Sequence, residues 1–211
     1  SEARHPLDLR PAIRNRVAFS YILAYGAHTY ELFAFRGWKF ALFALICTRH
    51  GLSVGLATGL VTVLALAGTV ASILGARLCL GNGRHRMITF VGIASAMVAL
   101  VCALVLDAPV WIALGCLFVY NVCIMLDSGA LTAGVVSVAG ERDRGALLAV
   151  HSMVGFAGGS LGAPAVGMML DLGGGSDGLD AWTGALLVMG LGSALVALIQ
   201  WRAWRRHGFA V

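Results

Sequence analysis

The chain has 211 residues, of which 59% are hydrophobic and 12% are charged, and its formal net charge is +5 at pH 7. Soluble domains carry about 25% charged residues, so this composition excludes an ordinary soluble fold and indicates a membrane protein. The sequence pI of about 9.3 does not predict nucleic-acid binding, because the basic residues form short clusters beside apolar segments and not one basic face.

Six apolar segments follow one another, each with room for the roughly 20 helical residues that cross a membrane. They cover residues 17–47, 51–76, 87–106, 110–139, 146–170 and 181–199. Membrane-spanning strands would have about ten residues of alternating polarity, a pattern that this sequence lacks. We therefore predict an all-α, six-transmembrane-helix bundle over residues 17–199, preceded by a cytoplasmic linker at 1–16 and followed by a cytoplasmic tail at 200–211.

The first segment is longer than a membrane requires, since a helix of this length spans roughly 45 Å and the hydrocarbon core is about 30 Å thick. Gly37 lies between Arg36 and Trp38 in this segment. The helix must therefore tilt strongly, protrude from the membrane or break, and Gly37, as a poor helix former, is the point where a break is expected.

The second segment carries no charge, and Gly51, Gly55 and Gly59 recur in it every four residues. This spacing predicts a small-residue face for close packing against another helix. The sixth segment is flanked by Trp182 and Trp201, which we interpret as anchors at the two membrane surfaces.

Twelve of the fifteen basic residues fall on one face of the predicted topology. They are Arg4, Arg10, Arg14, Arg16, Arg77, Arg84, Arg86, Arg142, Arg144, Arg202, Arg205 and Arg206. Because Lys and Arg are enriched in the cytoplasmic flanks of membrane spans, this face is predicted to be cytoplasmic, and both chain ends with it. Arg36, Lys39 and Arg49 are the exceptions, and all three lie toward the far end of the first segment.

One face of the first segment is polar and aromatic. At 100° per residue, about a third of the helix circumference carries Tyr21, Tyr25, His28, Glu31, Phe35 and Lys39. Glu31 lies roughly 21 Å along the helix, near mid-membrane, where an ionisable group costs at least about 2.5–3.5 kcal/mol. We predict that His28 and Glu31, with Tyr25 on the same face, contact substrate or a coupling proton. The alternative is a structural pair, because side chains three residues apart can hydrogen-bond along a helix.

The fourth segment contains a second polar group, Asn121 and Asp127, with Tyr120 on the face of Asp127. We predict that Asn121 and Asp127 also contribute to the substrate- or proton-binding site. The alternative for Asp127 is a packing role, paired with an arginine at the cytoplasmic rim. His151 of the glycine-rich fifth segment could reach Asp127 across a helix pair, or could serve as a structural hydrogen-bonding group.

The sequence contains no motif of a catalytic, cofactor or metal site. It has no HExxH, GxSxG or Walker A pattern, and its five cysteines form no CxxC or Cys/His cluster. We therefore expect a protein that is not an enzyme and that needs no cofactor and no metal.

Several stretches resemble a bacterial branch of the major facilitator superfamily. They are Ala24–Phe33 (AYGAHTYELF), Asp127–Gly129, Arg144–Ala146 and His151–Ser152. Gly83–Arg86 resembles the end of the family's short-loop motif, G-x-x-x-D-R-x-G-R-R. Leu80 stands in place of the acid of that motif and Ala76 in place of its first glycine, so the gate-latching role of the acid does not carry over.

The resemblance covers essentially the whole chain and is to the C-terminal half of such a transporter, a six-helix unit built as a 3+3 inverted repeat. It implies secondary active transport of a small solute by alternating access in the bacterial inner membrane, coupled to an ion such as the proton. The implied partners are the solute, protons, the lipid bilayer and the N-terminal six-helix half of the same transporter, with no nucleic acid. The chain begins at Ser1 with a linker-like stretch, so we expect it to be a fragment of a longer protein.

Two alternatives stay open. A non-transporting membrane sensor or assembly protein would use the buried charges structurally, and a complete six-helix transporter could act as a homodimer. Proton-dependent uptake into membrane vesicles distinguishes transport from the first of these.

Overall fold

In the computed structural model, which describes residues 9–80 and 83–207, helices follow one another along the chain. They are α1 (Arg10–Arg14), α2 (Arg16–Arg49), α3 (Val54–Leu78), α4 (Arg84–Leu104), α5 (Val110–Leu126), α6 (Ser128–Ser137), α7 (Arg144–Leu172) and α8 (Leu179–His207). These described residues contain no strand, which confirms the all-α prediction. Residues 1–8 of the predicted linker, 81–82 of the first predicted cytoplasmic loop and 208–211 of the predicted tail lie outside the described residues.

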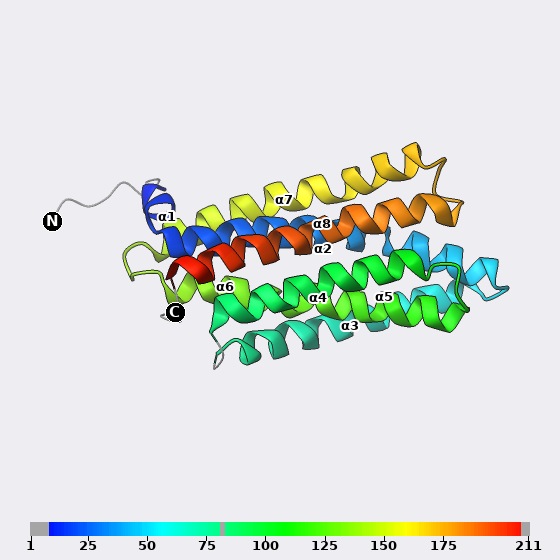
Figure 1. Ribbon diagram of the computed structural model, residues 1–211, viewed down its shortest axis with the longest axis horizontal. Coiled ribbons are helices and arrows are strands. Elements are labelled where there is room, and N and C mark those ends of the chain that lie inside the picture. The colour runs from blue at the N-terminus through cyan, green and yellow to red at the C-terminus, as the bar shows by residue number, and fades with distance from the viewer. Residues whose placement is uncertain (1–8, 81–82, 208–211) are drawn as a thin grey trace.

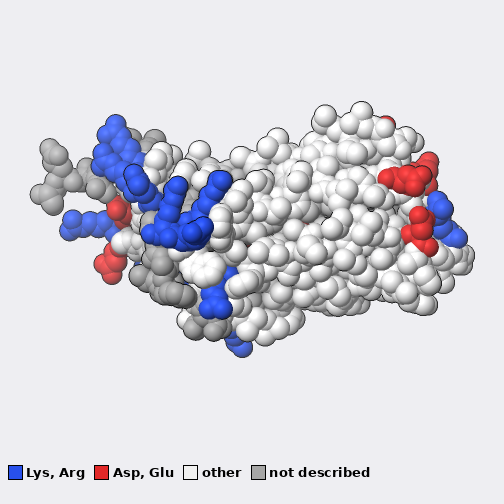
Figure 2. All heavy atoms as spheres, viewed as in Figure 1, with Lys and Arg blue, Asp and Glu red and all other residues white. Residues whose placement is uncertain are grey.

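The long helices run side by side along one axis (Figure 1). The α2–α3, α4–α5 and α7–α8 turns lie at one end of the bundle. The start of α2, the α3–α4 and α6–α7 connections and the end of α8 lie at the other. We call this second end the basic end, because arginine side chains gather there while the middle of the same view is free of charge (Figure 2). α2 is the central helix: it packs against α7 and α8 and also contacts α3, α5 and α6.

Five helical spans in the described part of the chain are long and apolar enough to cross a membrane. They are Val54–Leu78, Arg84–Leu104, Val110–Ser137, Arg144–Leu172 and Leu179–Arg206, with α5 and α6 counted together. This finding indicates a multi-pass membrane protein. α2 has 34 residues but is not one of the five. Polar and charged side chains lie along it, so the predicted sixth crossing is not confirmed by length and composition.

α2 is one continuous helix, so of the three alternatives for this long segment the break at Gly37 is wrong. The helix begins at a cap on Asn15, whose side-chain oxygen accepts the N–H of Ala18 at 3.0 Å and whose amide donates to the carbonyl of Val138 at 3.0 Å. A Cβ atom at Gly37 would lie 3.1 Å from the Cβ of Ala163 in α7. The glycine therefore permits contact between two helices and does not interrupt one.

The small-residue face that we predicted on α3 does not pack within the bundle. Gly55 would meet only a side chain of its own helix cap, and nothing lies within 4 Å of a Cβ at Gly59. The tight positions lie further along: a Cβ at Gly68 would be 3.0 Å from Met125, and one at Gly75 would overlap the carbonyl group of Leu126. The predicted packing of Gly55 and Gly59 within the bundle is therefore wrong. The glycines that do pack lie on the opposite side of α3, since Gly68 is nine residues, or about 180° of helix rotation, from Gly59.

The fourth apolar segment, predicted as one helix, is interrupted at Asp127. This residue ends α5 and precedes α6. α3 packs closely on both sides of the interruption, since Gly75 adjoins Leu126 and a Cβ at Gly129 would lie 2.8 Å from the carbonyl oxygen of Ser72. Gly75 of α3 and Gly129 of α6 therefore let the two backbones approach each other closely at the interruption.

α8 begins at Leu179 and continues without a break to His207, beyond the predicted boundary at residue 199. Trp182 at its start is fully buried, and its indole N–H donates to the carbonyl of Ser176 at 2.8 Å. The prediction of a surface anchor is therefore wrong for Trp182. Trp201, by contrast, is 40% exposed, as an anchor at the membrane surface would be.

Two apolar clusters form the core, one toward each end of the bundle. On α2, the buried members of the cluster at the basic end stop at Ala24, and those of the other cluster begin at Ala34. On α8 the corresponding limits are Val196 and Met189. The buried polar side chains of these two helices that lie between the limits are His28, Thr29, Glu31 and Ser193.

Replacing Gly75 with alanine is expected to lower the free energy of unfolding by about 1–3 kcal/mol, the usual cost of overpacking. The added methyl group would overlap the backbone of Leu126. Gly59→Ala is the matched control, because it makes the same change in the same helix where no atom lies within 4 Å. Thermal unfolding of the two variants in detergent measures the difference, and equal unfolding temperatures would contradict the close packing of α3 on Leu126.

Candidate functional site

A layer of buried polar side chains separates the two apolar clusters. Its ionisable members are His28 and Glu31 on α2, Asp127 between α5 and α6, and His151 on α7. Each of the four is at most 4% exposed. Because unpaired polar groups in such surroundings are costly, the contacts of these side chains determine how the helices can be arranged.

Glu31 is held by two hydroxyl groups from two other helices. The hydroxyl of Tyr120 on α5 donates to Oε1 at 2.6 Å, and the hydroxyl of Ser193 on α8 donates to Oε2. Ser193 can reach the carboxylate because its neighbour is Gly192, where a Cβ atom would lie 2.5 Å from the Cβ of Glu31. Both carboxylate oxygens therefore have a donor, as burial of this group requires.

His28 contacts Asp127, the residue at which α5 and α6 are interrupted. Nδ1 of the imidazole lies 2.8 Å from Oδ1 of the carboxylate, and both side chains are almost completely buried. Nε2 of His28 is also buried and has no hydrogen-bond partner among the described residues. The pair joins α2 to the α5–α6 interruption and leaves one ring nitrogen available for a further polar group.

Tyr25 lies against both buried histidines of the layer. Its ring stacks on His151 with the centroids 3.8 Å apart, and on His28 with the centroids 5.8 Å apart. Nε2 of His151 is 3.3 Å from the hydroxyl oxygen of Thr132 on α6. Tyr25 thereby places the α7 histidine beside the α2 histidine. Of the two alternatives for His151, the structure shows a contact with the Thr132 hydroxyl and no direct contact with Asp127 among the described residues.

Asn121, the remaining predicted site residue, makes a contact between helices. Its amide group donates to the carbonyl of Leu64 in α3 at 2.9 Å. It also lines a small cavity of about 50 Å³ between α2, α3 and α5, to which Arg36 and Lys39 contribute. The structure thus separates Asn121, which faces this cavity, from the carboxylates of Glu31 and Asp127.

The alternative role of His28 and Glu31, a hydrogen-bonded pair within one helix, is not formed, since each has a separate partner outside α2. The Glu31 contacts also have a chemical consequence, because a hydroxyl can both donate and accept a hydrogen bond. Tyr120 and Ser193 can therefore donate to an ionised carboxylate, and one of them can accept from a protonated one. The site can hold Glu31 in either protonation state without leaving an oxygen unpaired.

Sequence reasoning did not assign several residues that complete this layer. Ser193 and Thr132 were missed, because single hydroxyl side chains are common in apolar helices and carry no positional signal. A second polar group nearer the basic end was also missed. There the ring of His85 stacks on Tyr21 with the centroids 4.4 Å apart, and Nδ1 of His85 lies 2.6 Å from the side-chain oxygen of Gln200.

Residues 9–80 and 83–207 contain no group of three or more His, Cys, Asp or Glu side chains that could hold a metal ion. Comparisons of the chain with protein-family models, with curated proteins and with solved structures gave no match.

Tyr120→Phe is expected to lower the free energy of unfolding by about 1–3 kcal/mol, because it leaves a buried carboxylate oxygen without its donor. Tyr30→Phe is the control: its hydroxyl donates to the carbonyl of Val188 at 3.2 Å and does not contact Glu31. In a double-mutant cycle measured by thermal unfolding, Tyr120→Phe and Glu31→Gln should be non-additive by about 0.5–3 kcal/mol. Tyr30→Phe and Glu31→Gln should add, and strict additivity in both cycles would rule out the Tyr120–Glu31 contact.

Proposed function

We propose that this chain is the six-helix half of a secondary active transporter that moves a small solute by alternating access, with protons as the coupling ion. The observation that carries the proposal is the layer of buried ionisable groups at mid-height of an apolar helical bundle. Inside membranes such groups are expensive to keep, and they commonly mark solute or proton pathways.

The depth of Glu31 supports a place within the membrane. Counting from Arg16, where α2 begins, it lies roughly 22 Å along the helix. This places it near the middle of a hydrocarbon core of about 30 Å. In the proposal α2 is the sixth crossing, and its polar side chains are accommodated because they face other helices and not lipid.

Proton binding at Glu31 would change how firmly α2 is tied to its neighbours. Hydrogen bonds to an ionised group are roughly twice as strong as those between neutral groups. Protonation therefore weakens the contacts of Glu31 with Tyr120 on α5 and Ser193 on α8. A helix tied more weakly to both neighbours can move against them, which is the change that alternating access requires.

The helix interruption at Asp127 also supports the proposal of alternating-access transport. In secondary transporters the binding sites near mid-membrane are typically formed where helices are discontinuous. Here the interruption coincides with the buried contact between His28 and Asp127. In the proposal His28 and Asp127 bind solute or relay the proton, with Tyr25 beside them, and Asn121 contributes from the small cavity between α2, α3 and α5.

The proposed partner is the N-terminal six-helix half of the same transporter. Gly55 and Gly59 on α3 are exposed on the outside of this bundle, where they offer a small-residue surface to another helix. The basic end is assigned to the cytoplasm of a bacterial inner membrane, because cytoplasmic flanks carry the excess of arginine.

The test of transport uses the full-length protein in proteoliposomes supplied with an isotopically labelled bacterial cell extract and an inwardly directed proton gradient. We expect at least one small solute to accumulate, and an uncoupler to abolish its accumulation. Glu31→Gln keeps the shape of the side chain and removes its titration, so it should abolish accumulation but retain solute exchange. Glu141→Gln makes the same change in an exposed loop and should leave accumulation intact.

Two outcomes would contradict the proposal. Unchanged accumulation by Glu31→Gln would remove the proton role and leave Glu31 as a structural partner of Tyr120 and Ser193. If the wild-type protein accumulates no solute under any gradient, the protein is not a transporter, and a membrane sensor or assembly protein becomes the better reading.

The orientation is tested by labelling single cysteines in a variant without the five native ones. Asp177 lies in the exposed α7–α8 turn, and Arg142 in the exposed α6–α7 connection at the basic end. An impermeant maleimide added to intact cells should label Asp177→Cys and spare Arg142→Cys. Labelling of the second variant alone would reverse the assigned orientation.

A further inference from the structure

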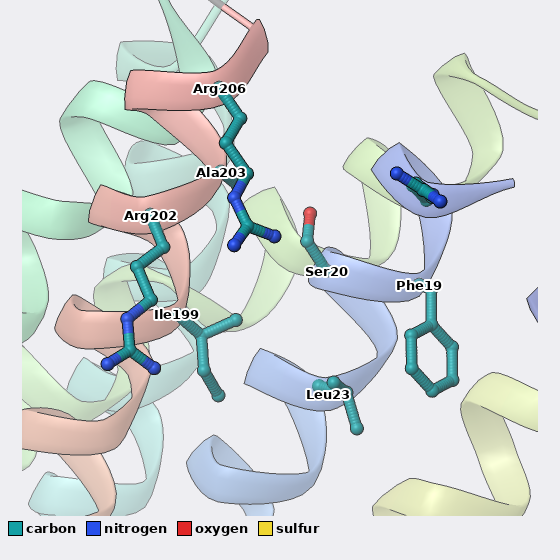
Figure 3. Close-up of a pocket in the computed structure, with 8 residues that line it drawn as sticks. Phe19, Ser20, Leu23, Ile199, Arg202, Ala203 and Arg206 are labelled. Carbon is teal, nitrogen blue, oxygen red and sulfur yellow. The ribbon is translucent and has the colours of Figure 1, made fainter.

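A cavity of about 530 Å³ opens between α2 and α8 at the basic end (Figure 3). It is lined by Arg16, Phe19, Ser20, Leu23, Ile199, Arg202, Ala203 and Arg206. Its volume lies within the range of about 300–1,000 Å³ that is usual for small-molecule sites. The functional site described above makes no use of it.

The polar part of the cavity carries three arginines and no acid. Arg16 begins α2, and Arg202 and Arg206 lie in the last turns of α8. Figure 3 shows the side chain of Arg206 extending into the space between α8 and Ser20 of α2. No acidic side chain within residues 9–80 and 83–207 forms an ion pair with any of the three arginines. Three guanidinium groups around one space repel one another, and an anion between them removes this repulsion.

Apart from Ser20, the rest of the lining is apolar, and it extends toward the middle of the bundle. Leu23 lies two turns beyond Arg16, roughly 10 Å further along α2, and is 41% exposed. Phe19 of α2 and Ile199 of α8 line the cavity from the two facing helices. The half-exposed Trp201 on α8 is typical of the level of the lipid headgroups. The cavity is cationic at one end and apolar toward the membrane interior. It therefore complements an amphipathic molecule that has an anionic headgroup and an apolar chain.

We propose that this cavity binds an anionic phospholipid, with the phosphate between Arg16, Arg202 and Arg206 and an acyl chain along Leu23 and Ile199. Basic pockets between membrane-spanning helices are suited to anionic headgroups. A free inorganic anion would use the arginines but not the apolar lining. The proposal concerns lipid binding alone and does not depend on transport.

The test measures lipid binding to the full-length protein, purified in detergent and freed of native lipid. The probes are phosphatidylglycerol, phosphatidylcholine with the same acyl chains, and inorganic phosphate. Phosphatidylglycerol should raise the unfolding temperature in a saturable manner and remain bound in native mass spectrometry. Phosphatidylcholine and inorganic phosphate should do neither.

The double variant Arg202→Gln/Arg206→Gln should weaken the apparent affinity for phosphatidylglycerol about thirtyfold, since each basic residue near the membrane surface contributes roughly fivefold. Arg142→Gln/Arg205→Gln is the matched control, because it removes the same charge from the same end. Neither residue lines the cavity, and Arg205 lies 5.3 Å from the centre of the Trp201 ring. This control should retain the wild-type affinity within about fivefold.

Three results would each overturn the proposal. Equal weakening in the two double variants would show general attraction to the basic end and no site. An equal effect of phosphatidylcholine would show that the headgroup charge is not recognised. Stabilisation by inorganic phosphate to the same extent would identify the ligand as a free anion. Unfolding of the lipid-free variants at the wild-type temperature establishes that the substitutions leave the fold intact.

Discussion

Burying a carboxylate at mid-height of an apolar bundle is unfavourable unless both of its oxygens find donors. Glu31 meets this requirement through Tyr120 on α5 and Ser193 on α8. Because these donors lie on different helices, α2 has a single rotation and a single depth at which both hydrogen bonds can form. The central position of α2 then transmits that placement to the other helices that it contacts.

The polar contacts are short because backbones approach closely at glycine. Gly192 brings α8 to Glu31, and a Cβ at Gly155 of α7 would lie 2.5 Å from the ring of Tyr25, which stacks on His151. Gly75 likewise lets the backbone of α3 approach that of Leu126 at the end of α5. A larger side chain at any of these positions would move a helix away from the layer. These three glycines are therefore part of the arrangement of the site, although none of them carries chemistry.

Much of the helical organisation could be predicted from the sequence, because helices that cross a membrane need long apolar runs bounded by charge. The partners of the buried groups could not, since pairing depends on the rotation of each helix. Gly55 and Gly75 look alike in the sequence, yet one is exposed and the other packs against a backbone. Ser193 likewise has no feature that separates it from other hydroxyl side chains in apolar helices. Asp127, followed by Ser128 and Gly129, did carry a signal, because these residue types favour helix ends over helix interiors.

Side-chain hydrogen bonds join α2 and α8 both near mid-height and nearer the basic end, which links the ionisable layer to that end. Glu31 bonds Ser193 near mid-height, and the side chain of Gln200 donates to the carbonyl of Ser20 at 3.0 Å nearer the end. The arginine-lined cavity lies beside this second contact. In the proposed mechanism, weakening the Glu31 contact lets α2 and α8 separate. A headgroup that bridges the two helices favours the arrangement in which they are close. Because such coupling is reciprocal, lipid in the cavity would oppose the movement that proton binding promotes, and protonation of Glu31 would weaken lipid binding by the same factor.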